Sequence, residues 1–180
     1  MLSQKIAVVT GGGGFIGSHV ADQLKVADVQ NLVIVRRKDY DLTRESDVAR
    51  LFLSHPSDVV VHLAGLVGGI LALKTHPVEY CSANLLMNTY MMHYAWKNKT
   101  THFLAIGAGC GYPQNASNPL LENDLWNGYP QPETAAYALA KRLLTVQGDA
   151  YTTQYGFKAI TVIPGNVYGP GDNFDLQSAN

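Results

Sequence analysis

Short runs of apolar, β-branched residues alternate along the chain with longer segments in which apolar residues recur at helical spacing. Strands alternating with helices are typical of a parallel sheet with crossover helices, so the fold class predicted is α/β, a doubly wound parallel sheet. The apolar runs predict strands at Ile6–Thr10, Leu32–Val35, Val59–Leu63, Phe103–Ile106 and Lys158–Ile163. The periodic segments predict helices at Phe15–Val26, Leu42–Ser54, Pro77–Lys97 and Ala135–Tyr155.

Two features of the pattern lie outside these elements. Tyr112–Pro132 is rich in Pro, Asn and Gly and predicts a long loop, and loops of that length are usually functional. Asp41 or Thr43 is a plausible cap for the helix that begins near Leu42. The last residues, Asn173–Asn180, carry no helix or strand signal, so we expect residues 1–180 to form one domain that is truncated at its C-terminal end.

Composition restricts the class of protein. The net charge of −1 gives no reason to expect nucleic acid or an anionic membrane as a partner. The longest apolar stretch, His62–Leu73, is too short to span a bilayer. The two cysteines, Cys81 and Cys110, form no disulfide framework, so we expect a reduced, cytoplasmic setting. The sequence suggests no metal ligands.

Three glycines follow the first predicted strand and lead into the first predicted helix. Gly11, Gly14 and Gly17 permit a tight turn, close approach of the backbone to a pyrophosphate, and close packing of helix and strand. The negative phosphates then lie at the positive helix end. A glycine-rich turn without ligand is the alternative, but strand before and helix after favour a Rossmann dinucleotide site.

The end of the second strand indicates which dinucleotide is bound. A carboxylate there would bind the ribose 2′-hydroxyl of NAD, whereas arginine accommodates a 2′-phosphate. Here Arg36, Arg37 and Lys38 follow Val35. A solvated basic turn is the alternative, but the pattern favours NADP over NAD, with Arg36 and Arg37 as phosphate partners.

Tyr137 and Lys141 stand four residues apart and share one face of the predicted helix Ala135–Tyr155. The nearby ammonium, together with an oxidised nicotinamide, is expected to lower the pKa of the Tyr137 phenol toward working pH. The spacing alone arises easily by chance among ten tyrosines. Its place after the fourth strand of a dinucleotide fold favours a catalytic pair.

These motifs resemble the extended short-chain dehydrogenase/reductase superfamily and, within it, the family of GDP-L-fucose synthases, the GDP-4-keto-6-deoxymannose epimerase/reductases. The glycine loop and the Tyr137/Lys141 pair belong to the superfamily. The more specific likeness lies in the segments Val67–Ile70, Cys110–Pro113 and Gly169–Phe174.

The resemblance implies roles for individual residues. Tyr137 would be the general acid in C4 reduction, Lys141 would hold the nicotinamide ribose, and Cys110 would be the base that removes protons at C3 and C5. Asn166 would face the sugar. The remaining cofactor contacts implied are Phe15 and Ile16 beside the glycines, Leu63, Ala64, Gly65, Ile106, Gly107, Ala108, Pro164, Gly165 and Val167. For a lone cysteine such as Cys110, a small buried hydrophobe is the alternative.

Two departures from the family pattern matter. The catalytic Ser/Thr position is occupied by Ala108, and losing a donor of that kind can cost on the order of 10²–10³ in rate. The family's acid partner of the cysteine is a histidine expected just past Asn180. All six histidines precede Cys110, and His62 is interpreted as a satisfied core histidine.

The leading hypothesis is an NADP-dependent nucleotide-sugar epimerase/reductase, of which these residues are the N-terminal part, with the smaller C-terminal substrate portion missing. An epimerase without reduction, motivated by Ala108, is a close variant. A catalytically silent NADP-binding module is the alternative from another class. The resemblance also implies a homodimer packed through the helices Pro77–Lys97 and Ala135–Tyr155.

Overall fold

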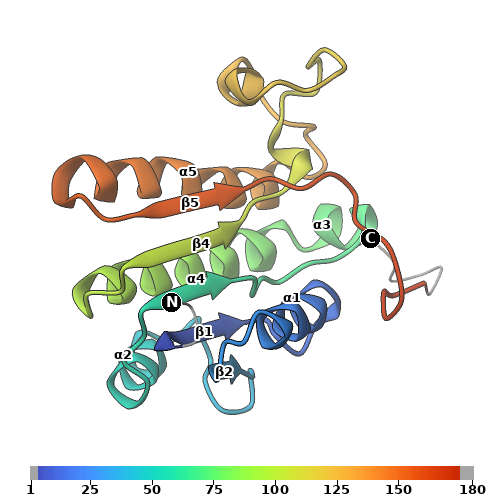
Figure 1. The fold of residues 1–180 in the computed structure, drawn as a ribbon. Helices are drawn as coiled ribbons and strands as arrows, with labels where there is room; N and C mark the ends of the chain where they lie inside the picture. Colours follow the sequence, from blue (N-terminus) through green and yellow to red (C-terminus); the bar gives the residue numbers. More distant parts are fainter. Residues whose placement is uncertain (1–3, 175–180) are drawn as a thin grey trace.

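A single parallel sheet organises residues 4–174, which are the residues that the computed structural model describes. Its strand order is β2-β1-β3-β4-β5, and all four pairings are parallel. Figure 1 shows α1 in front of the sheet and α4 and α5 behind it. The predicted doubly wound α/β fold is therefore confirmed.

The elements follow the order expected from the sequence. The strands are β1 Ile6–Thr10, β2 Asn31–Val35, β3 Val59–His62, β4 His102–Ile106 and β5 Ala159–Val162. The α-helices are α1 Phe15–Val26, α2 Glu45–Ser54, α3 Ile70–Thr75, α4 Pro77–Lys97 and α5 Ala135–Tyr155. Two 3₁₀ helices, η2 Gly109–Gly111 and η3 Glu122–Trp126, lie in the connection between β4 and α5.

The predicted helix at Leu42–Ser54 begins three residues late. The Asp41 carboxylate accepts hydrogen bonds from the Thr43 backbone N–H at 3.1 Å and from the Thr43 hydroxyl at 2.7 Å. This local turn occupies both candidate caps, and Arg44 takes the N-cap position of α2 without a side-chain cap. Neither Asp41 nor Thr43 therefore caps the helix.

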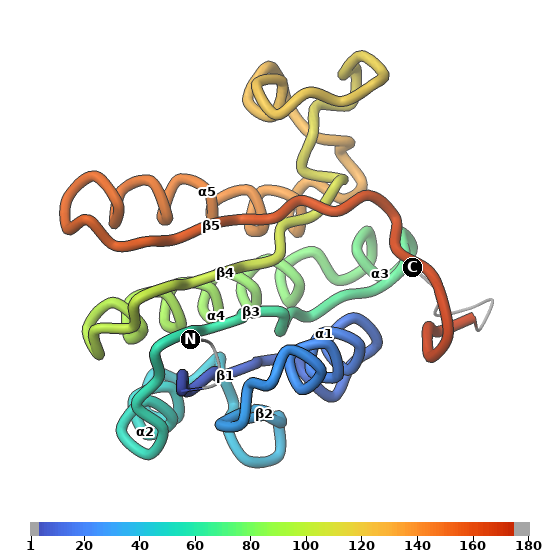
Figure 2. The backbone as a smooth tube through the Cα atoms, viewed as in Figure 1, coloured from blue at the N-terminus to red at the C-terminus, as the bar shows by residue number. Residues whose placement is uncertain are grey.

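Three short helices, α3, η2 and η3, were not predicted. The six-residue α3 begins inside the apolar stretch His62–Leu73 and ends at Thr75, and fewer than two turns of helix give no clear periodic signal. The five-residue η3 lies within the predicted loop 112–132. Figure 2 shows this segment standing away from the sheet as a lobe, which we call the lobe 112–132.

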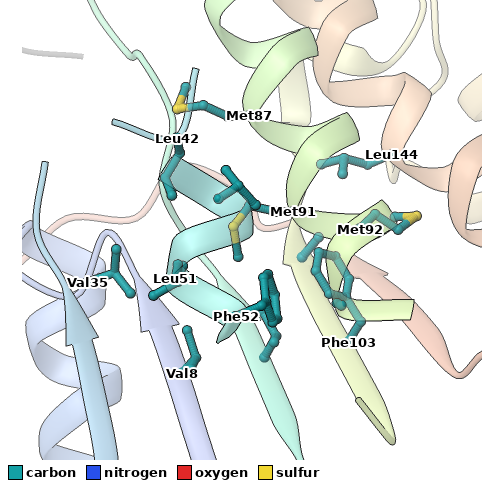
Figure 3. Packing of buried hydrophobic residues seen from close by; sticks show 14 of the residues in the cluster. Val8, Val35, Leu42, Leu51, Phe52, Met87, Met91, Met92, Phe103 and Leu144 are labelled. Carbon is teal, nitrogen blue, oxygen red and sulfur yellow. The ribbon is translucent and has the colours of Figure 1, made fainter. Parts of the chain in front are cut away.

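One hydrophobic core joins the sheet to the helices behind it. Figure 3 shows Leu51 and Phe52 of α2, Met91 of α4 and Leu144 of α5 gathered over Val8 and Phe103 of the sheet. Every one of these six side chains is at most 1% exposed. The core fixes where α4 and α5 stand relative to the strands, and so where their polar side chains emerge.

The strand register sets the carboxyl ends of the strands along one edge. Thr10 is paired with Val35 and with His62, and Ile106 is paired with Val162. In an open parallel sheet, ligands bind in the crevice outside these ends. The segments that follow the strands are therefore the place to look for a site.

Candidate functional site

The glycine loop between β1 and α1 is shaped by two close backbone approaches. Gly11 has φ +68°, and a Cβ built there would lie 2.7 Å from the Ala64 backbone nitrogen. A Cβ on Gly17 would overlap the Gly11 carbonyl oxygen. Both positions therefore exclude a side chain, as the sequence argument for packing predicts.

The N-terminal end of α1 is open to an anion. Gly14 is the N-cap, no side chain caps the helix, and its first turn, which includes Phe15, Ile16 and Gly17, holds no acidic residue. The amides of the first turn and the positive end of the helix dipole are therefore not neutralised by the protein. This arrangement fits a pyrophosphate.

Arg36 and Arg37 lie at the same edge, directly after β2, and both are exposed. Within residues 4–174 neither guanidinium donates a hydrogen bond or joins an ion pair. The Arg37 charge contributes to lowering the pKa of Asp41, after the two hydrogen bonds from Thr43. The two arginines are available to a 2′-phosphate beside the glycine loop.

The segment after β3 lies between the glycine loop and α5. The backbone nitrogen of Leu63 donates to the Thr10 carbonyl at 3.2 Å, and that of Ala64 donates to the Thr10 hydroxyl at 3.1 Å. A Cβ built on Gly65 would lie 3.3 Å from Lys141 Nζ. The structure thus places Leu63, Ala64 and Gly65 along one path from the loop to Lys141.

Lys141 is buried at the end of this path. Its side chain is almost completely enclosed, and Nζ donates a hydrogen bond of 3.0 Å to the Ile106 carbonyl. Burial lowers the pKa of this ammonium to about 8, and the charge of Cys110 acts in the opposite direction. Lys141 is therefore mostly protonated at neutral pH, and its pKa lies only slightly above that pH.

Cys110 and Tyr137 lie with Lys141 in one electrostatic cluster. Burial raises the pKa of the Cys110 thiol, while the Lys141 charge lowers it. Burial also raises the pKa of Tyr137, and Cys110 adds to that increase. The expectation that the ammonium lowers the tyrosine pKa is wrong for the protein without cofactor, because burial raises this pKa and the charge of Cys110 raises it further.

The turn after β4 carries Gly107, Ala108 and Cys110. The Gly107 nitrogen donates to the Val162 carbonyl at 2.8 Å, which joins the turn to β5. Ala108 is the N-cap of η2 and offers no hydroxyl to a substrate. Within residues 4–174 the Tyr137 hydroxyl makes no hydrogen bond.

The segment after β5 crosses the same edge toward α1, as Figure 2 shows. A Cβ on Gly109 would lie 3.3 Å from the Pro164 carbonyl, so Pro164 faces the Cys110 turn. Further along, the His19 ring nitrogen donates to the Pro170 carbonyl at 2.8 Å. Gly165, Asn166 and Val167 lie between these two contacts and are exposed.

One residue of the site was missed by the sequence analysis. Asn84 of α4 is fully buried, and its amide donates to the Leu66 carbonyl at 2.9 Å and the Tyr80 carbonyl at 2.7 Å. Its Oδ1 has no hydrogen-bond partner among residues 4–174, and a Cβ on Gly65 would lie 3.0 Å from it. A polar residue in the middle of an apolar helix was the only signal in the sequence.

His62, by contrast, is a core residue, as predicted. Its Nε2–H donates to Asn88 Oδ1 at 3.1 Å, so Nδ1 accepts from the Thr10 hydroxyl at 2.7 Å. Asn88 in turn donates to the Ala140 carbonyl at 3.3 Å. The network ties β1, β3, α4 and α5 together directly beneath the site.

Two kinds of feature are absent from residues 4–174. No group of three or more His, Cys, Asp or Glu side chains there is arranged to hold a metal ion. In the same part of the chain, no helix has the length and apolar character needed to cross a membrane.

Comparisons with known proteins agree with this geometry. A family model described as the NAD dependent epimerase/dehydratase family matches residues 7–180. GDP-L-fucose synthase 1 of Arabidopsis thaliana is 34% identical over 172 residues, which cover 96% of this chain and 53% of that protein. The chain thus spans about half the length of the curated relatives it matches.

Solved structures give the same result. A GDP-D-glycero-L-gluco-heptose synthase from Campylobacter jejuni, crystallised with NADPH, superposes with a TM-score of 0.94 at 27% identity and covers 99% of this chain and 52% of its own. A GDP-L-fucose synthetase from Naegleria fowleri bound to NADP has a TM-score of 0.91 at 27% identity, with 100% and 56% covered. The resemblance seen in the motifs is confirmed.

Proposed function

The chain belongs to the NAD dependent epimerase/dehydratase family, and we propose that it is the NADP-binding, catalytic part of an enzyme that epimerises and reduces a GDP-4-keto-6-deoxy-sugar. The observation that carries the proposal is the cluster of Cys110, Tyr137 and Lys141 at the strand ends, beside an anion-accepting helix end. A protein that only bound a dinucleotide would need the helix end but not the thiol and the phenol. The names of the relatives supply the sugar class.

The residues present fit NADP. The helix end behind Gly11, Gly14 and Gly17 would hold the pyrophosphate, and Arg36 and Arg37 would hold the 2′-phosphate. Lys141, next to Gly65, would hold the nicotinamide ribose. When bound, NADPH supplies a hydride to a carbonyl carbon.

Tyr137 is suited to donate a proton. Because burial raises its pKa, the phenol stays protonated at neutral pH. In C4 reduction the phenol donates its proton to the ketone oxygen as negative charge develops there.

Cys110 is suited to remove a proton from a carbon beside the ketone, because the ketone makes those C–H groups acidic. The base is the thiolate. Burial disfavours the thiolate and Lys141 favours it. Proton removal at C3 and C5 is therefore expected to rise with pH as the thiol ionises.

Ala108 supports a second candidate, an epimerase that does not reduce its product. Without a hydroxyl at this position, the ketone oxygen lacks one of the donors that the family pattern supplies for hydride transfer. Proton exchange by Cys110 depends less on that donor. A catalytically silent NADP-binding module is the third candidate.

We also propose a homodimer that packs through α4 and α5. Leu86 of α4 and Leu143 and Val146 of α5 are 40%, 41% and 46% exposed, so apolar surface lies on the outer side of both helices. Burying such surface against a second copy would remove it from water. Sedimentation equilibrium of the protein tests this proposal, and a monomer at all concentrations would contradict it.

One experiment separates the three candidates. The protein is incubated with GDP-4-keto-6-deoxymannose in deuterated water, with and without NADPH, while deuterium in the sugar and NADPH consumption are followed. We expect deuterium to enter the sugar even without NADPH, and we expect NADPH to be consumed when it is present. Cys110→Ser is expected to abolish the label, whereas Tyr137→Phe is expected to abolish consumption and retain the label. Deuterium incorporation without NADPH consumption indicates the epimerase that does not reduce its product. NADPH binding with neither deuterium incorporation nor NADPH consumption indicates the silent module.

A further inference from the structure

Arg142 is a buried cation without a counterion. It follows Lys141 on α5 and is only 5% exposed. Within residues 4–174 no carboxylate forms an ion pair with it, and burial lowers the pKa of its guanidinium. An unpaired buried charge is costly, so the contacts that compensate this arginine indicate what it does.

Within residues 4–174, every hydrogen bond that its guanidinium donates goes to a backbone carbonyl. Nε donates to the Gly111 carbonyl at 2.8 Å, and Nη2 donates to the same oxygen. Nη1 donates to the Gly128 carbonyl at 3.1 Å. The guanidinium carbon also lies 4.9 Å from the centre of the Trp126 ring, a cation–π contact. Such contacts fix the course of the main chain.

The two carbonyls lie at the base of the lobe 112–132. Gly111 is the residue through which the chain enters the lobe, and Gly128 lies where it returns toward α5. The two sides are joined once more by the Gln114 nitrogen, which donates to the Tyr129 carbonyl at 3.0 Å. Arg142 therefore clamps both sides of the lobe to α5. Figure 1 shows the lobe above α5.

Gly111 directly follows Cys110, and both belong to η2. Its carbonyl is attached through Arg142 to the helix that also carries Tyr137 and Lys141. We propose that Arg142 is the positioning residue of Cys110: it fixes the turn that holds the thiol against Tyr137 and Lys141. The catalytic meaning of this role rests on the proposed function, whereas the placement of the thiol does not.

A lysine could not replace this arginine. The planar guanidinium directs two N–H groups at one carbonyl and a third at another, while its face lies against an indole. An ammonium is a compact point charge that offers none of this fixed geometry. Arg142→Lys therefore separates geometry from charge, and Arg142→Met removes both.

The test measures the placement of Cys110 without requiring activity. The full chain carries Cys81→Ser, so that Cys110 is the only thiol, and its alkylation by iodoacetamide is followed as a function of pH. Loss of the clamp exposes the thiol and relieves the burial that raises its pKa. In both Arg142 variants we expect alkylation about tenfold faster at neutral pH and a midpoint shifted down toward that of a free thiol.

A matched control is Arg50→Met. Arg50 also lies over an aromatic ring, that of Tyr40 at 4.3 Å, and also donates to a carbonyl, that of Asp39 at 2.8 Å. It belongs to α2, away from the Cys110 turn. Its loss is expected to leave the alkylation profile unchanged.

Wild-type alkylation profiles in folded Arg142 variants would overturn the proposal. A profile altered in Arg142→Met but restored in Arg142→Lys would also overturn it, because charge alone would then suffice. If neither variant folds, Trp126→Leu decides, since this 52% exposed ring can be removed with little loss of core. It is expected to give a smaller shift in the same direction, and an unchanged profile would contradict the proposal.

A second readout links the placement to catalysis. In Arg142→Lys we expect deuterium incorporation into the sugar to fall at least about tenfold in kcat, with KM and NADPH affinity within about twofold. A wild type that incorporates no deuterium contradicts the proposed function, but the alkylation result still decides the role of Arg142. The two proposals therefore fail separately.

Discussion

Lys141 on α5 donates a hydrogen bond of 3.0 Å to the carbonyl oxygen of Ile106, the last residue of β4. The contact joins the helix that carries Tyr137 to the strand that leads to Cys110. The same ammonium is buried and influences the pKa of Cys110. One residue thus both aligns the two segments of the site and supplies its positive charge.

Replacing Lys141 by Met separates function from stability. Because burial lowers the Lys141 pKa to about 8, the folded state disfavours this charge. We therefore expect Lys141→Met to have a free energy of unfolding no lower than wild type at neutral pH, while NADPH affinity falls about tenfold and turnover is lost. Urea denaturation measures the free energy of unfolding, and fluorescence titration measures NADPH affinity. A wild-type NADPH affinity in Lys141→Met would contradict the proposed contact of Lys141 with the cofactor.

Restoring a hydroxyl at position 108 tests the departure from the family pattern. Ala108→Ser is expected to raise the rate of NADPH consumption with the ketosugar by on the order of 10²-fold, because a second donor then reaches the ketone oxygen. Deuterium incorporation by Cys110 is expected to change little. Equal consumption in the two proteins would show that the missing hydroxyl does not limit reduction.

The preference for NADP is expected to depend on Arg37. Arg37→Met should weaken NADPH binding about 10- to 100-fold and leave NADH binding unchanged, since only NADPH carries the 2′-phosphate. Arg44→Met is the matched control, because it removes a nearby exposed guanidinium that is already paired with Asp41. Titration of each variant with both dinucleotides gives the result. Equal losses for NADPH and NADH would argue against a 2′-phosphate contact.

Two glycines of the same loop are expected to differ sharply in how well they tolerate replacement by alanine. A Cβ on Gly17 would overlap the Gly11 carbonyl, whereas a Cβ on Gly13 meets nothing within 4 Å. Gly17→Ala is therefore expected to cost about 3 kcal/mol or more in free energy of unfolding, as overpacking against backbone does. Gly13→Ala should remain within about 0.5 kcal/mol of wild type. Denaturation without cofactor measures both, and comparable losses would contradict the steric argument.

His62 predicts a specific dependence of stability on pH. Burial, and to a smaller extent the Lys141 charge, lowers its pKa to about 3 from an ordinary value of 6.5. The unfolded chain then takes up a proton below pH 6.5 that the folded chain does not, so this contribution is complete above pH 6.5 and is lost as pH falls toward 3.

The expected slope is up to about 1.4 kcal/mol of unfolding free energy per pH unit below pH 6. Urea denaturation at several pH values checks it, with His62→Gln lacking the slope whatever its overall stability. The pKa values of Asp41, Asp47 and Asp58 are lowered from an ordinary value of 3.8. The stability that these carboxylates contribute is therefore lost only in more acidic solution. An identical slope in His62→Gln would exclude the histidine as its origin.

Local sequence signals were sufficient to predict the long helices. The bounds of α1, α4 and α5 agree with the prediction residue for residue. In α4, Pro77 occupies the first turn, where its missing N–H costs nothing. The predicted start of α2 was wrong, because the Asp41 carboxylate accepts hydrogen bonds from Thr43 in a local turn and does not cap the helix.

The sequence by itself determined the succession of strands and helices along the chain and the glycine loop, and it singled out Cys110, Tyr137 and Lys141 as candidate site residues, because these depend on local spacing and on steric limits at single residues. Only the tertiary structure decided their electrostatics. It raised the pKa of Tyr137 where a lower value was expected, and it left Asn84 Oδ1 unpartnered beside the site. Burial and hydrogen-bond partners come from segments far apart in the chain, and no local pattern encodes which side chains those segments enclose. The clamp formed by Arg142 has the same origin, since its partners lie 31 and 14 residues away.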